Sequence, residues 1–332
     1  MKANSKAELA TKVIEENLSI TANRTLAKIL FNKYPMQFKD VEAARVVIRD
    51  VQNKLGKTNI RPSTTAFTER LARLRAEHQI DFREQEDKTP YTFSEKINKA
   101  LVLGDFHIPY TDPKALDLAL EYGFNKNVDC IIINGDFLDF STISRFSHKP
   151  NEMGVRGQLE NGIEMLKYLQ GALGVKVVYH YGNHDVRCEL YMIRQAPELY
   201  YNNKLEKLLN LDALGVDYVE DYRFMKFGNL NIAHGHHIVK GIFAPVNAAR
   251  GVFTKTNTST MINHVHRTSE HIESDMNGKI IGCYSNGALT TVKPTYNPQV
   301  SKHNQGFSVV EKDPTNGDFI VDSKKIINYK IR

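Results

Sequence analysis

The sequence predicts an α/β domain with a largely parallel sheet, preceded by a small all-helical domain. Three short apolar runs rich in β-branched residues each end in Gly followed by Asp or Asn, and helical stretches separate them. The runs lie at 100–105, 130–136 and 175–185, and the helical stretches at 112–123 and 158–171. This alternation is typical of a parallel sheet with helices on its faces. Because ligands of such sheets bind at the carboxyl ends of the strands, we expect a site at that edge.

The last third of the chain has the pattern of hairpins. From Tyr222 onward the apolar runs are short, and Asn-Gly pairs at 277–278 and 316–317 provide two-residue turns. We therefore expect the sheet to gain an antiparallel part.

The N-terminal segment predicts three helices. Ser5 and Glu8 form a capping-box signature at the start of the first helix. Thr21 or Asn23 is expected to cap the second helix, which Pro35 ends.

The third N-terminal helix is expected to have an apolar back and a polar front. Asp40 is its expected cap and Gly56 its expected stop. An apolar stripe at helical spacing consists of Val41, Ala44, Ile48, Val51 and Leu55. Arg45, Arg49 and Lys57 belong to the neighbouring face and are the candidate contacts to nucleic acid. The three-helix unit resembles the helix-turn-helix class, whose last helix enters the major groove.

The positive charge of the chain is confined to its front. Residues 1–75 carry 15 Lys and Arg against 7 Asp and Glu, whereas the remainder is slightly acidic although the whole chain has a net charge of +6. A basic segment beside a near-neutral domain favours polyanionic partners, although a solvated basic helical surface would have the same composition.

These patterns divide the chain into three parts. Residues 1–58 form the basic helical domain and residues 97–332 the α/β domain. Residues 59–96 form a linker with a charged helical stretch from about 68 to 78 and no strand pattern.

Composition excludes several classes of protein. With 41% hydrophobic and 25% charged residues the chain reads as a soluble globular protein, and no apolar run reaches the roughly 18–20 residues of a membrane span. The opening residues lack the apolar stretch of a signal peptide, and the three cysteines are far apart. We therefore expect a cytoplasmic protein without a membrane partner or a disulfide framework.

Five groups of ligand-type residues follow predicted strands. They are GDFH at 104–107, GDFLD at 135–139, GNHD at 182–185, HGHH at 234–237 and NHVHR at 263–267. Any one of them alone is a weak signal. Burying so many polar side chains without a metal would leave many of them unpaired, so the combination indicates a metal centre.

This motif series resembles that of the calcineurin-like metallophosphoesterase superfamily over roughly residues 98–330. The resemblance implies a four-layered α/β sandwich, with two mixed sheets flanked by helices, around a two-metal site. Its implied ligands are Asp105, His107 and His266 for the first metal, Asp136 as the bridge, and Asn183, His234 and His264 for the second. His236 and His237 are alternatives to His234, which we favour because Gly235 follows it as in the family.

The resemblance also assigns catalytic roles. It makes His184 the catalytic histidine beside the phosphate, oriented by Asp185 or Asp139. A histidine polarised by a carboxylate can protonate a leaving alkoxide near neutral pH. Three basic residues are candidates for contacts with substrate phosphates: Arg145, Arg250 and Arg267.

Two divalent ions suit this chemistry. At about 3.5–4 Å from each other they can activate a water and hold the phosphoryl oxygens during in-line attack, and a carboxylate bridge keeps them together. A set of nitrogen and oxygen donors without thiolate fits Mn²⁺, Fe or Zn²⁺, of which we favour Mn²⁺.

The sequence departs from the family pattern at two places. Asn263 stands where the family has Gly before its paired histidines, which changes the turn but keeps the spacing of His264 and His266. Asp139 is followed by Phe140 and Ser141, whereas the protein serine/threonine phosphatases carry Asp-Arg-Gly. This second departure argues against a phosphoprotein phosphatase.

The favoured function is that of a metal-dependent phosphodiesterase or nuclease acting on nucleic acid, with DNA favoured over RNA. The layout of a basic helical head before a phosphoesterase resembles phosphoesterases of phages and prophages. The alternative is a small-molecule phosphodiesterase or phosphomonoesterase whose N-terminal unit serves as an oligomerisation or lid element. A binding module that holds metal only for structure would lack the catalytic histidine, which is present here as His184.

Overall fold

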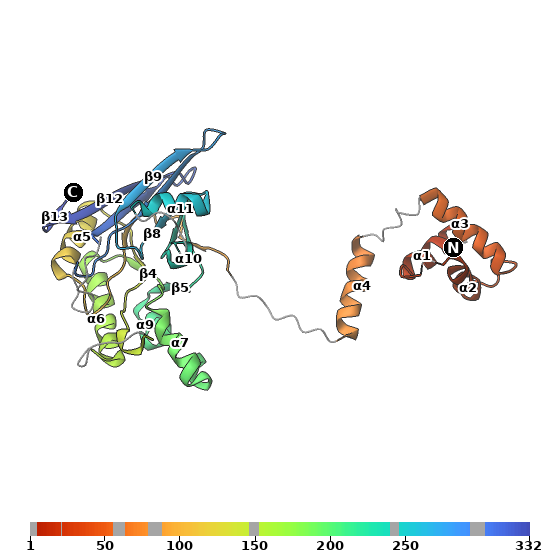
Figure 1. Ribbon diagram of the computed structural model, residues 1–332, viewed down its shortest axis with the longest axis horizontal. Coiled ribbons are helices and arrows are strands. Elements are labelled where there is room, and N and C mark those ends of the chain that lie inside the picture. The colour runs from red at the N-terminus through yellow and green to blue at the C-terminus, as the bar shows by residue number, and fades with distance from the viewer. Residues whose placement is uncertain are drawn as a thin grey trace. The chain divides into compact units, whose positions relative to one another are not determined.

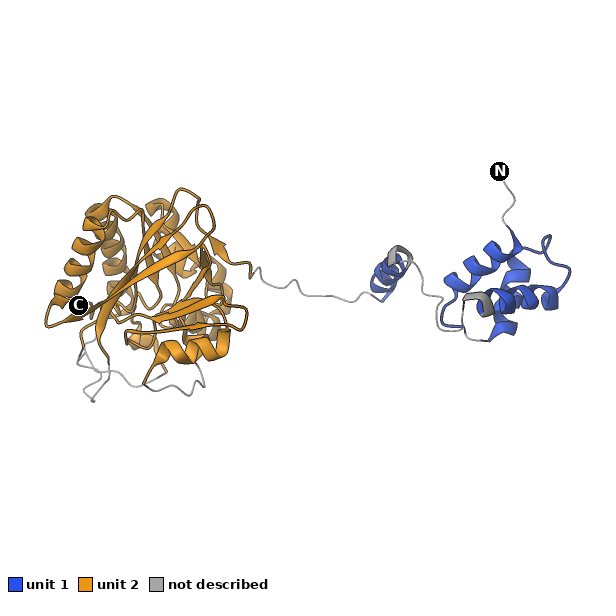
Figure 2. Cartoon of the chain, turned by 90° about the horizontal axis from the view of Figure 1, so that it is seen from above, with its two compact units in different colours: residues 1–86 blue, residues 87–332 orange. Residues whose placement is uncertain are grey.

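The chain divides into two compact units, residues 1–86 and 87–332 (Figures 1 and 2). The division falls inside the predicted linker 59–96. The computed structural model describes residues 5–20, 22–55, 64–78, 88–145, 153–239, 246–292 and 303–332.

The first unit contains the three predicted helices and the charged helical stretch that follows them. Its helices are α1 (Lys6–Glu16), α2 (Asn23–Lys33), α3 (Val41–Leu55) and α4 (Thr64–Glu77). The apolar faces of α1, α2 and α3 pack together around fully buried Val13, Leu30 and Ile48. This small core explains why the apolar stripe of α3 recurs at helical spacing.

The capping predictions for this unit have mixed outcomes. The capping box of Ser5 and Glu8 is confirmed, and Asp40 accepts a hydrogen bond from the backbone N–H of Ala43 at the start of α3. The predicted cap of α2 is wrong: Ala22 takes the cap position without a side-chain hydrogen bond. Asn23 is already the first helical residue, so its side chain lies past the position from which it could cap. Gly56 lies outside the described residues.

The second unit is built on two mixed sheets, as the resemblance predicts, and not on the single sheet with an antiparallel part that the strand pattern alone predicts. The seven-stranded sheet has the order β13-β12-β11-β2-β3-β4-β5, and the six-stranded sheet has the order β1-β6-β7-β8-β10-β9. The strands of the first are β2 (Lys99–Leu103), β3 (Cys130–Asn134), β4 (Lys176–His180), β5 (Asp217–Val219), β11 (Gln305–Lys312), β12 (Phe319–Ile327) and β13 (Lys330–Ile331). Those of the second are β1 (Tyr91–Thr92), β6 (Met225–Phe227), β7 (Leu230–Ala233), β8 (Thr260–Ile262), β9 (Ser269–Ser274) and β10 (Ile280–Ser285).

Parallel and antiparallel parts are distributed as the sequence indicates. Strands β2 to β5 pair in parallel, whereas β6 with β7, β9 with β10 and β11 with β12 are antiparallel hairpin pairs. Gly278 and Gly317 sit in the turns of the last two pairs with φ of +81° and +77°, which explains the Asn-Gly signals. The prediction that no strand precedes residue 96 is wrong, since β1 pairs with β6. The strand could not be recognised in the sequence because it has only two residues, too few for a pattern.

Helices cover the outer faces of the two sheets. They are α5 (Pro113–Asn125), α6 (Val155–Leu173), α7 (Val186–Gln195), α8 (Leu205–Leu208), α9 (Leu211–Leu214), α10 (His236–Val239) and α11 (Ala248–Thr256), with the 3-10 turns η1 (Ser141–Ile143) and η2 (Pro197–Asn202).

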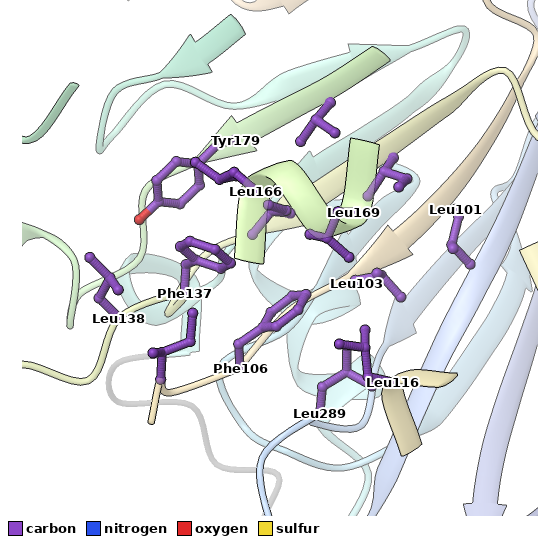
Figure 3. Close-up of a cluster of buried hydrophobic side chains, with 14 of the residues drawn as sticks. Leu101, Leu103, Phe106, Leu116, Phe137, Leu138, Leu166, Leu169, Tyr179 and Leu289 are labelled. Carbon is purple, nitrogen blue, oxygen red and sulfur yellow. The ribbon is translucent and has the colours of Figure 1, made fainter. Parts of the chain in front are cut away.

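Alternating residues of the central strands supply two different cores. On β2, Leu101 and Leu103 pack with α5 and α6 on the outer face of the seven-stranded sheet (Figure 3). Val102, between them, faces the other way and packs with Ile232 of the six-stranded sheet. Because successive side chains of a strand point to opposite faces, a strand covered on both sides is apolar throughout.

A third apolar cluster completes the layering. Val252 of α11 packs on Ile262 and Cys283, which belong to the six-stranded sheet. The unit therefore has four layers, in the order helices, seven-stranded sheet, six-stranded sheet, helix. This is the sandwich that the sequence motifs imply.

In the described part of the chain, every helix is too short or too polar to cross a bilayer.

Candidate metal centre

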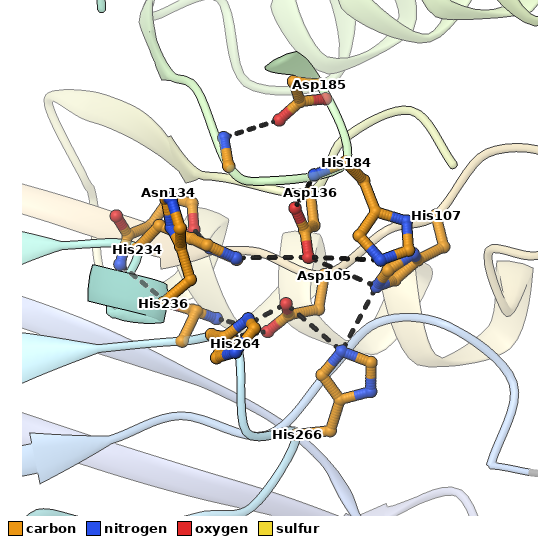
Figure 4. A network of polar contacts seen from close by, with 12 residues as sticks. Asp105, His107, Asn134, Asp136, His184, Asp185, His234, His236, His264 and His266 are labelled. Atoms are coloured by element: carbon orange, nitrogen blue, oxygen red, sulfur yellow. Dashed lines mark hydrogen bonds and ion pairs between the residues drawn. The ribbon is translucent and has the colours of Figure 1, made fainter. Parts of the chain in front are cut away.

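The ligand-type residues gather at one edge of the sandwich because they follow the ends of neighbouring strands. Asp105 and Asp136 lie two residues beyond β2 and β3, and Asn183 lies three residues beyond β4. From the other sheet, His234 directly follows β7 and His264 follows β8 by two residues. Figure 4 shows side chains from both sheets pointing toward one another at this edge.

The first cluster is formed by Asp105, His107 and His266. The Nε2 atoms of the two histidines lie 3.2 Å apart, and Nε2 of His266 lies 3.3 Å from Oδ1 of Asp105. Nδ1 of His107 lies 2.9 Å from Oδ1 of Asp139, so the ring donates that N–H and keeps a lone pair on Nε2. This is the outer hydrogen bond that orients a metal-binding imidazole.

The second cluster is formed by Asp136, His234 and His264. Oδ2 of Asp136 lies 3.1 Å from Nε2 of His234 and 3.8 Å from Nε2 of His107 in the first cluster. Nδ1 of His234 lies 2.9 Å from the carbonyl oxygen of Asn134, so Nε2 is the ring atom that faces the site. Burial opposes protonation of His234, but Asp136 raises its pKa to about 10, so a bound metal ion would replace the proton on Nε2. Asp136 thus lies between the two clusters, in the position of a bridging ligand.

The electrostatics of the site favour ionised carboxylates. Burial opposes ionisation of Asp136, but His234 and His184 hold its pKa well below the usual range. Burial likewise opposes ionisation of Asp105, and His266 lowers its pKa. Burial and the neighbouring His234 lower the pKa of His264 to about 4, so this imidazole is neutral, as a metal ligand must be.

Unpaired buried atoms show that these residues fit a metal. Oδ1 of Asn183 and Nδ1 of His264 are buried without a hydrogen-bond partner among the described residues. Nε2 of His234 is buried as well, and it lies 3.1 Å from Oδ2 of Asp136. Buried polar atoms of this kind are rare unless a ligand satisfies them.

Five of the seven candidate ligands have a left-handed backbone conformation. Their φ angles lie between +49° and +68°, and the residues are Asp105, His107, Asp136, His264 and His266. This conformation is uncommon for any residue but glycine and clusters at functional sites. The sharp turns after the strands aim the side chains back over the edge of the sandwich.

Two glycines of the motifs permit close packing against these ligands. A Cβ on Gly182 would collide with the backbone nitrogen and a side-chain oxygen of Asp136, and one on Gly135 would collide with the ring of His234. Gly135 also has a φ of +83°. Both glycines are therefore required by the space beside the second cluster.

His184 lies at the rim of the centre with three polar partners. Its Nδ1 lies 3.1 Å from Oδ1 and 3.0 Å from the carbonyl oxygen of Asp139. A guanidinium nitrogen of Arg187 lies 2.9 Å from its Nε2, and a second one donates to the carbonyl oxygen of Asp139. With these partners the neutral ring carries its proton on Nδ1 and accepts from Arg187 on Nε2.

Of the two carboxylates considered as partners of His184, the structure brings Asp139 against it and not Asp185. Asp185 is fully buried and accepts hydrogen bonds from the backbone N–H groups of Phe137, Leu138 and Gly182. It ties the loops after β3 and β4 together and so positions the backbone on which Asp136 and His184 sit. Orienting His184 is therefore a wrong assignment for Asp185, since its acceptor sites are occupied by the backbone.

The geometry also separates the three neighbouring histidines. His234 contacts Asp136, whereas His236 and His237 both turn to Asp221, with Nε2 to Oδ1 distances of 3.3 Å and 3.0 Å. His234 is therefore the candidate ligand of the second cluster.

The three arginines predicted to contact substrate phosphates are less directly connected to the centre than the candidate ligands are. Arg267 precedes strand β9. Its positive charge contributes, after burial and His266, to lowering the pKa of His303, whose ring centroid lies 4.6 Å from that of His266. Arg250 lies in α11 and Arg145 follows η1. The role of both arginines as phosphate contacts stays a prediction.

The predicted nucleic-acid contacts belong to the first unit. Arg45 and Arg49 are exposed on α3, as expected, and Arg45 makes a surface ion pair of 3.3 Å with Glu42. Lys57 lies outside the described residues.

Sequence reasoning did not assign roles to Arg187 and His303. Arg187 lies one helical turn after His184, a spacing that the sequence shows. His303 belongs to a segment distant in sequence from His266, whose ring it contacts, and no local motif predicts this contact.

Sequence reasoning also assigned no role to Asn263, which stands where the family has Gly. Its side chain contacts a candidate metal ligand. It is fully buried, its amide donates to Oδ2 of Asp105 over 3.2 Å, and its oxygen accepts from the amide of Asn134 over 2.9 Å. The Asn263 side chain therefore orients Asp105, a candidate ligand, without itself being one.

We expect Asn263→Ala to weaken metal binding by roughly 10–100-fold, the usual effect of losing an outer hydrogen-bond partner. Asp105 would keep its backbone hydrogen bond from His264 but lose the one from the amide. Competition with a chelator measures the affinity, and Asn229→Ala, in the turn between β6 and β7, is the matched control. Equal affinities of the two variants would contradict the positioning role.

Comparison with known proteins agrees with this geometry. Residues 99–285 match the model of the calcineurin-like phosphoesterase family. The Gene 54 protein of Mycobacterium phage L5 is 27% identical over 184 residues, which cover 51% of this chain and 69% of that protein.

Among solved structures, a Vps29 single mutant from Entamoeba histolytica is 14% identical, with a TM-score of 0.37, and covers 70% of this chain and 96% of its own. The phosphoesterase Yfce from E. coli is 14% identical, with a TM-score of 0.34, and covers 68% of this chain and 97% of its own. The family model spans more than half of the 332 residues and includes every candidate metal ligand. The chain therefore belongs to the calcineurin-like phosphoesterase family.

Proposed function

We propose that this phosphoesterase hydrolyses phosphodiester bonds in nucleic acid with a dinuclear metal centre, and that DNA is its favoured substrate. The observation that carries the proposal is the position of Asp136 between two clusters of buried donors, with His184 at their rim. Family membership gives phosphoester hydrolysis, and the exposed arginines of the first unit support nucleic acid as the substrate.

The donor set supports the proposed metal ligands. Asp105, His107 and His266 would hold one ion and Asn183, His234 and His264 the other, with Asp136 shared. Ions bound there would activate a water and withdraw charge from the phosphoryl oxygens. The nitrogen and oxygen donors suit Mn²⁺, which we favour, as well as Fe and Zn²⁺.

His184 and Arg187 are placed to serve the leaving group. In the proposed mechanism the guanidinium of Arg187 moves from Nε2 of His184 to a phosphoryl oxygen of the substrate, where planar guanidinium binds well. With Nε2 released, His184 would take up a proton from solvent there, keep its Nδ1–H on Asp139, and donate the Nε2 proton to the leaving oxygen.

The first unit supplies the argument for nucleic acid. It contains the predicted helical unit, and α3 presents Arg45 and Arg49 to solvent on the side away from its buried stripe. Phosphate contacts from such a helix would hold the polymer beside the phosphoesterase unit.

We expect Arg45→Ala with Arg49→Ala to weaken duplex DNA binding and to flatten its salt dependence. Each neutralised phosphate contributes about −0.9 to the slope of log K against log salt, so two lost contacts reduce the slope by up to about 2. Fluorescence anisotropy at several salt concentrations measures this, and hydrolysis of bis(p-nitrophenyl) phosphate should stay unchanged.

The matched control removes the same charge elsewhere in the unit. Lys12 on α1 and Lys28 on α2 are also exposed, and their double Ala variant should bind DNA nearly as the wild type does. If both double variants lost the same affinity, α3 would have no special role. If the full chain bound no DNA or RNA in a salt-sensitive way, the nucleic-acid proposal would fail.

One observation favours the alternative substrate class. The ion pair of Arg45 with Glu42 partly neutralises the face that would meet DNA. If this face does not bind DNA, the chain would hydrolyse a small phosphodiester or phosphomonoester, and the first unit would act as a lid or in oligomerisation.

A further inference from the structure

A third group of metal-ligand side chains lies beside the two clusters described above. It consists of Asp221, His236 and His237, and one donor atom from each lies within 4.8 Å of the others. Both imidazoles direct Nε2 at the same carboxylate oxygen of Asp221. None of the three is among the seven candidate ligands of the dinuclear centre.

The fold holds these side chains in place. Asp221 lies two residues beyond β5, and His236 and His237 are the first residues of α10, directly after the turn at Gly235. The ring of Tyr222 stacks on that of His237, with centroids 3.6 Å apart and an angle of 18° between the planes. The side chains of Asp221 and His236 are only 14% and 13% exposed, so the donors converge in a place largely withdrawn from water.

A cavity beside the group contains a further unpaired donor. Asp221, His236 and His237 line a cavity of about 230 Å³, and so does His180, which is only 3% exposed. Nδ1 of His180 lies 3.1 Å from Oδ1 of Asn134, which leaves the lone pair on Nε2. That Nε2 is buried and has no hydrogen-bond partner among the described residues. A buried imidazole lone pair beside a cavity indicates an occupant that it can bind.

The group adjoins the dinuclear centre without sharing its ligands. The ring of His236 lies 5.4 Å from that of His234 and 6.0 Å from that of His264, between centroids. Figure 4 shows His236 beside His234, on the opposite side of the centre from His107 and His184. An ion held by Asp221 would therefore be a neighbour of the second cluster.

We propose that Asp221, His236 and His237 bind a third divalent transition-metal ion. Two imidazoles and one carboxylate are a donor set that Zn²⁺ and related ions accept, and three protein ligands leave a position open toward the cavity. His180, directly or through a water, would occupy that side. This site does not depend on the substrate proposed above.

The test is the metal content of the full chain. Protein stripped with a chelator is loaded with excess Zn²⁺, desalted and analysed by mass spectrometry for ions per chain. We expect about three ions for the wild type and about two for Asp221→Asn and for His237→Ala. His271→Ala is the matched control, because His271 pairs with Glu273 on β9 over 2.7 Å and belongs to no group of three metal-ligand side chains among the described residues. The metal content of this variant should stay at about three ions per chain.

A second measurement guards against a variant that fails to fold. His237 is the most exposed of the three residues, with 36% of its side chain accessible, so His237→Ala is the variant least able to disturb the core. When Co²⁺ replaces Zn²⁺, the visible absorption of His237→Ala should lack the component of Co²⁺ at the third site that the wild type shows. His271→Ala should show the same absorption as the wild type.

The outcomes separate this site from the dinuclear centre. Equal ion content and equal Co²⁺ spectra for wild type, Asp221→Asn and His237→Ala would overturn the proposal and leave a hydrogen-bonded triad without metal. A wild type with a single ion that His237→Ala loses would support the third site and contradict the dinuclear centre.

Discussion

Asp136→Asn is expected to abolish hydrolysis more completely than any other single substitution in the centre. The carboxylate of Asp136 is 1% exposed and stands between His234 and His107, one from each cluster. An amide keeps the shape but loses the negative charge that holds two cations together, so the content of bound metal should fall as well. Hydrolysis of a chromogenic phosphodiester and ions per chain are the two measurements.

Asp117→Asn provides the control for this substitution. Asp117 is exposed on α5 and accepts a hydrogen bond from Tyr168, so neither metal content nor activity should change. The bridging role is refuted if Asp136→Asn stays fully active, or if the wild type binds at most one ion at saturation.

His184→Ala is expected to lower turnover by roughly 10²–10⁴-fold, the usual contribution of general acid catalysis, while metal content stays near that of the wild type. His184 is not among the seven donors: its Nδ1 faces Asp139, and its Nε2 is 4.0 Å from Oδ2 of Asp136. Steady-state kinetics and elemental analysis of the same preparation separate loss of catalysis from loss of metal.

The identity of the leaving group provides the control for His184. A nitrophenolate needs little protonation, so the defect of His184→Ala should be smaller with a nitrophenyl ester than with an alkyl ester. An equal defect with both substrates would contradict the general-acid role and leave His184 as a phosphate contact.

The metal centre could be predicted because its residues directly follow strands. Apolar runs that end in Gly-Asp or Gly-Asn give both the strand and the edge at which Asp105, Asp136 and Asn183 appear, and parallel pairing of β2, β3 and β4 makes them neighbours. Short-range rules thus predicted the edge of the sheet, the hairpin turns and the cap at Ser5, whereas the role of each ligand came from the resemblance to the family.

Long-range contacts could not be predicted in the same way. The choice of Asp139 over Asp185 as the partner of His184 depends on which carboxylate is already occupied by backbone N–H groups, and this emerges only from the packed loops. Asp221 and His303 come from segments far from the ligands they approach. The two-residue strand β1 depends on its partner β6 and has no pattern of its own.

The left-handed residues of the centre have a consequence for the thermodynamics of the fold. A residue other than glycine in this conformation costs of order 1–2 kcal/mol, and five candidate ligands adopt it. Together they oppose a net stability that is roughly 5–15 kcal/mol for a typical domain. A sequence optimised only for resistance to unfolding would place glycine at these five positions and lose its imidazoles and carboxylates. The domain therefore sacrifices resistance to heat for a preorganised set of ligands, and bound cations would return part of that stability by mass action.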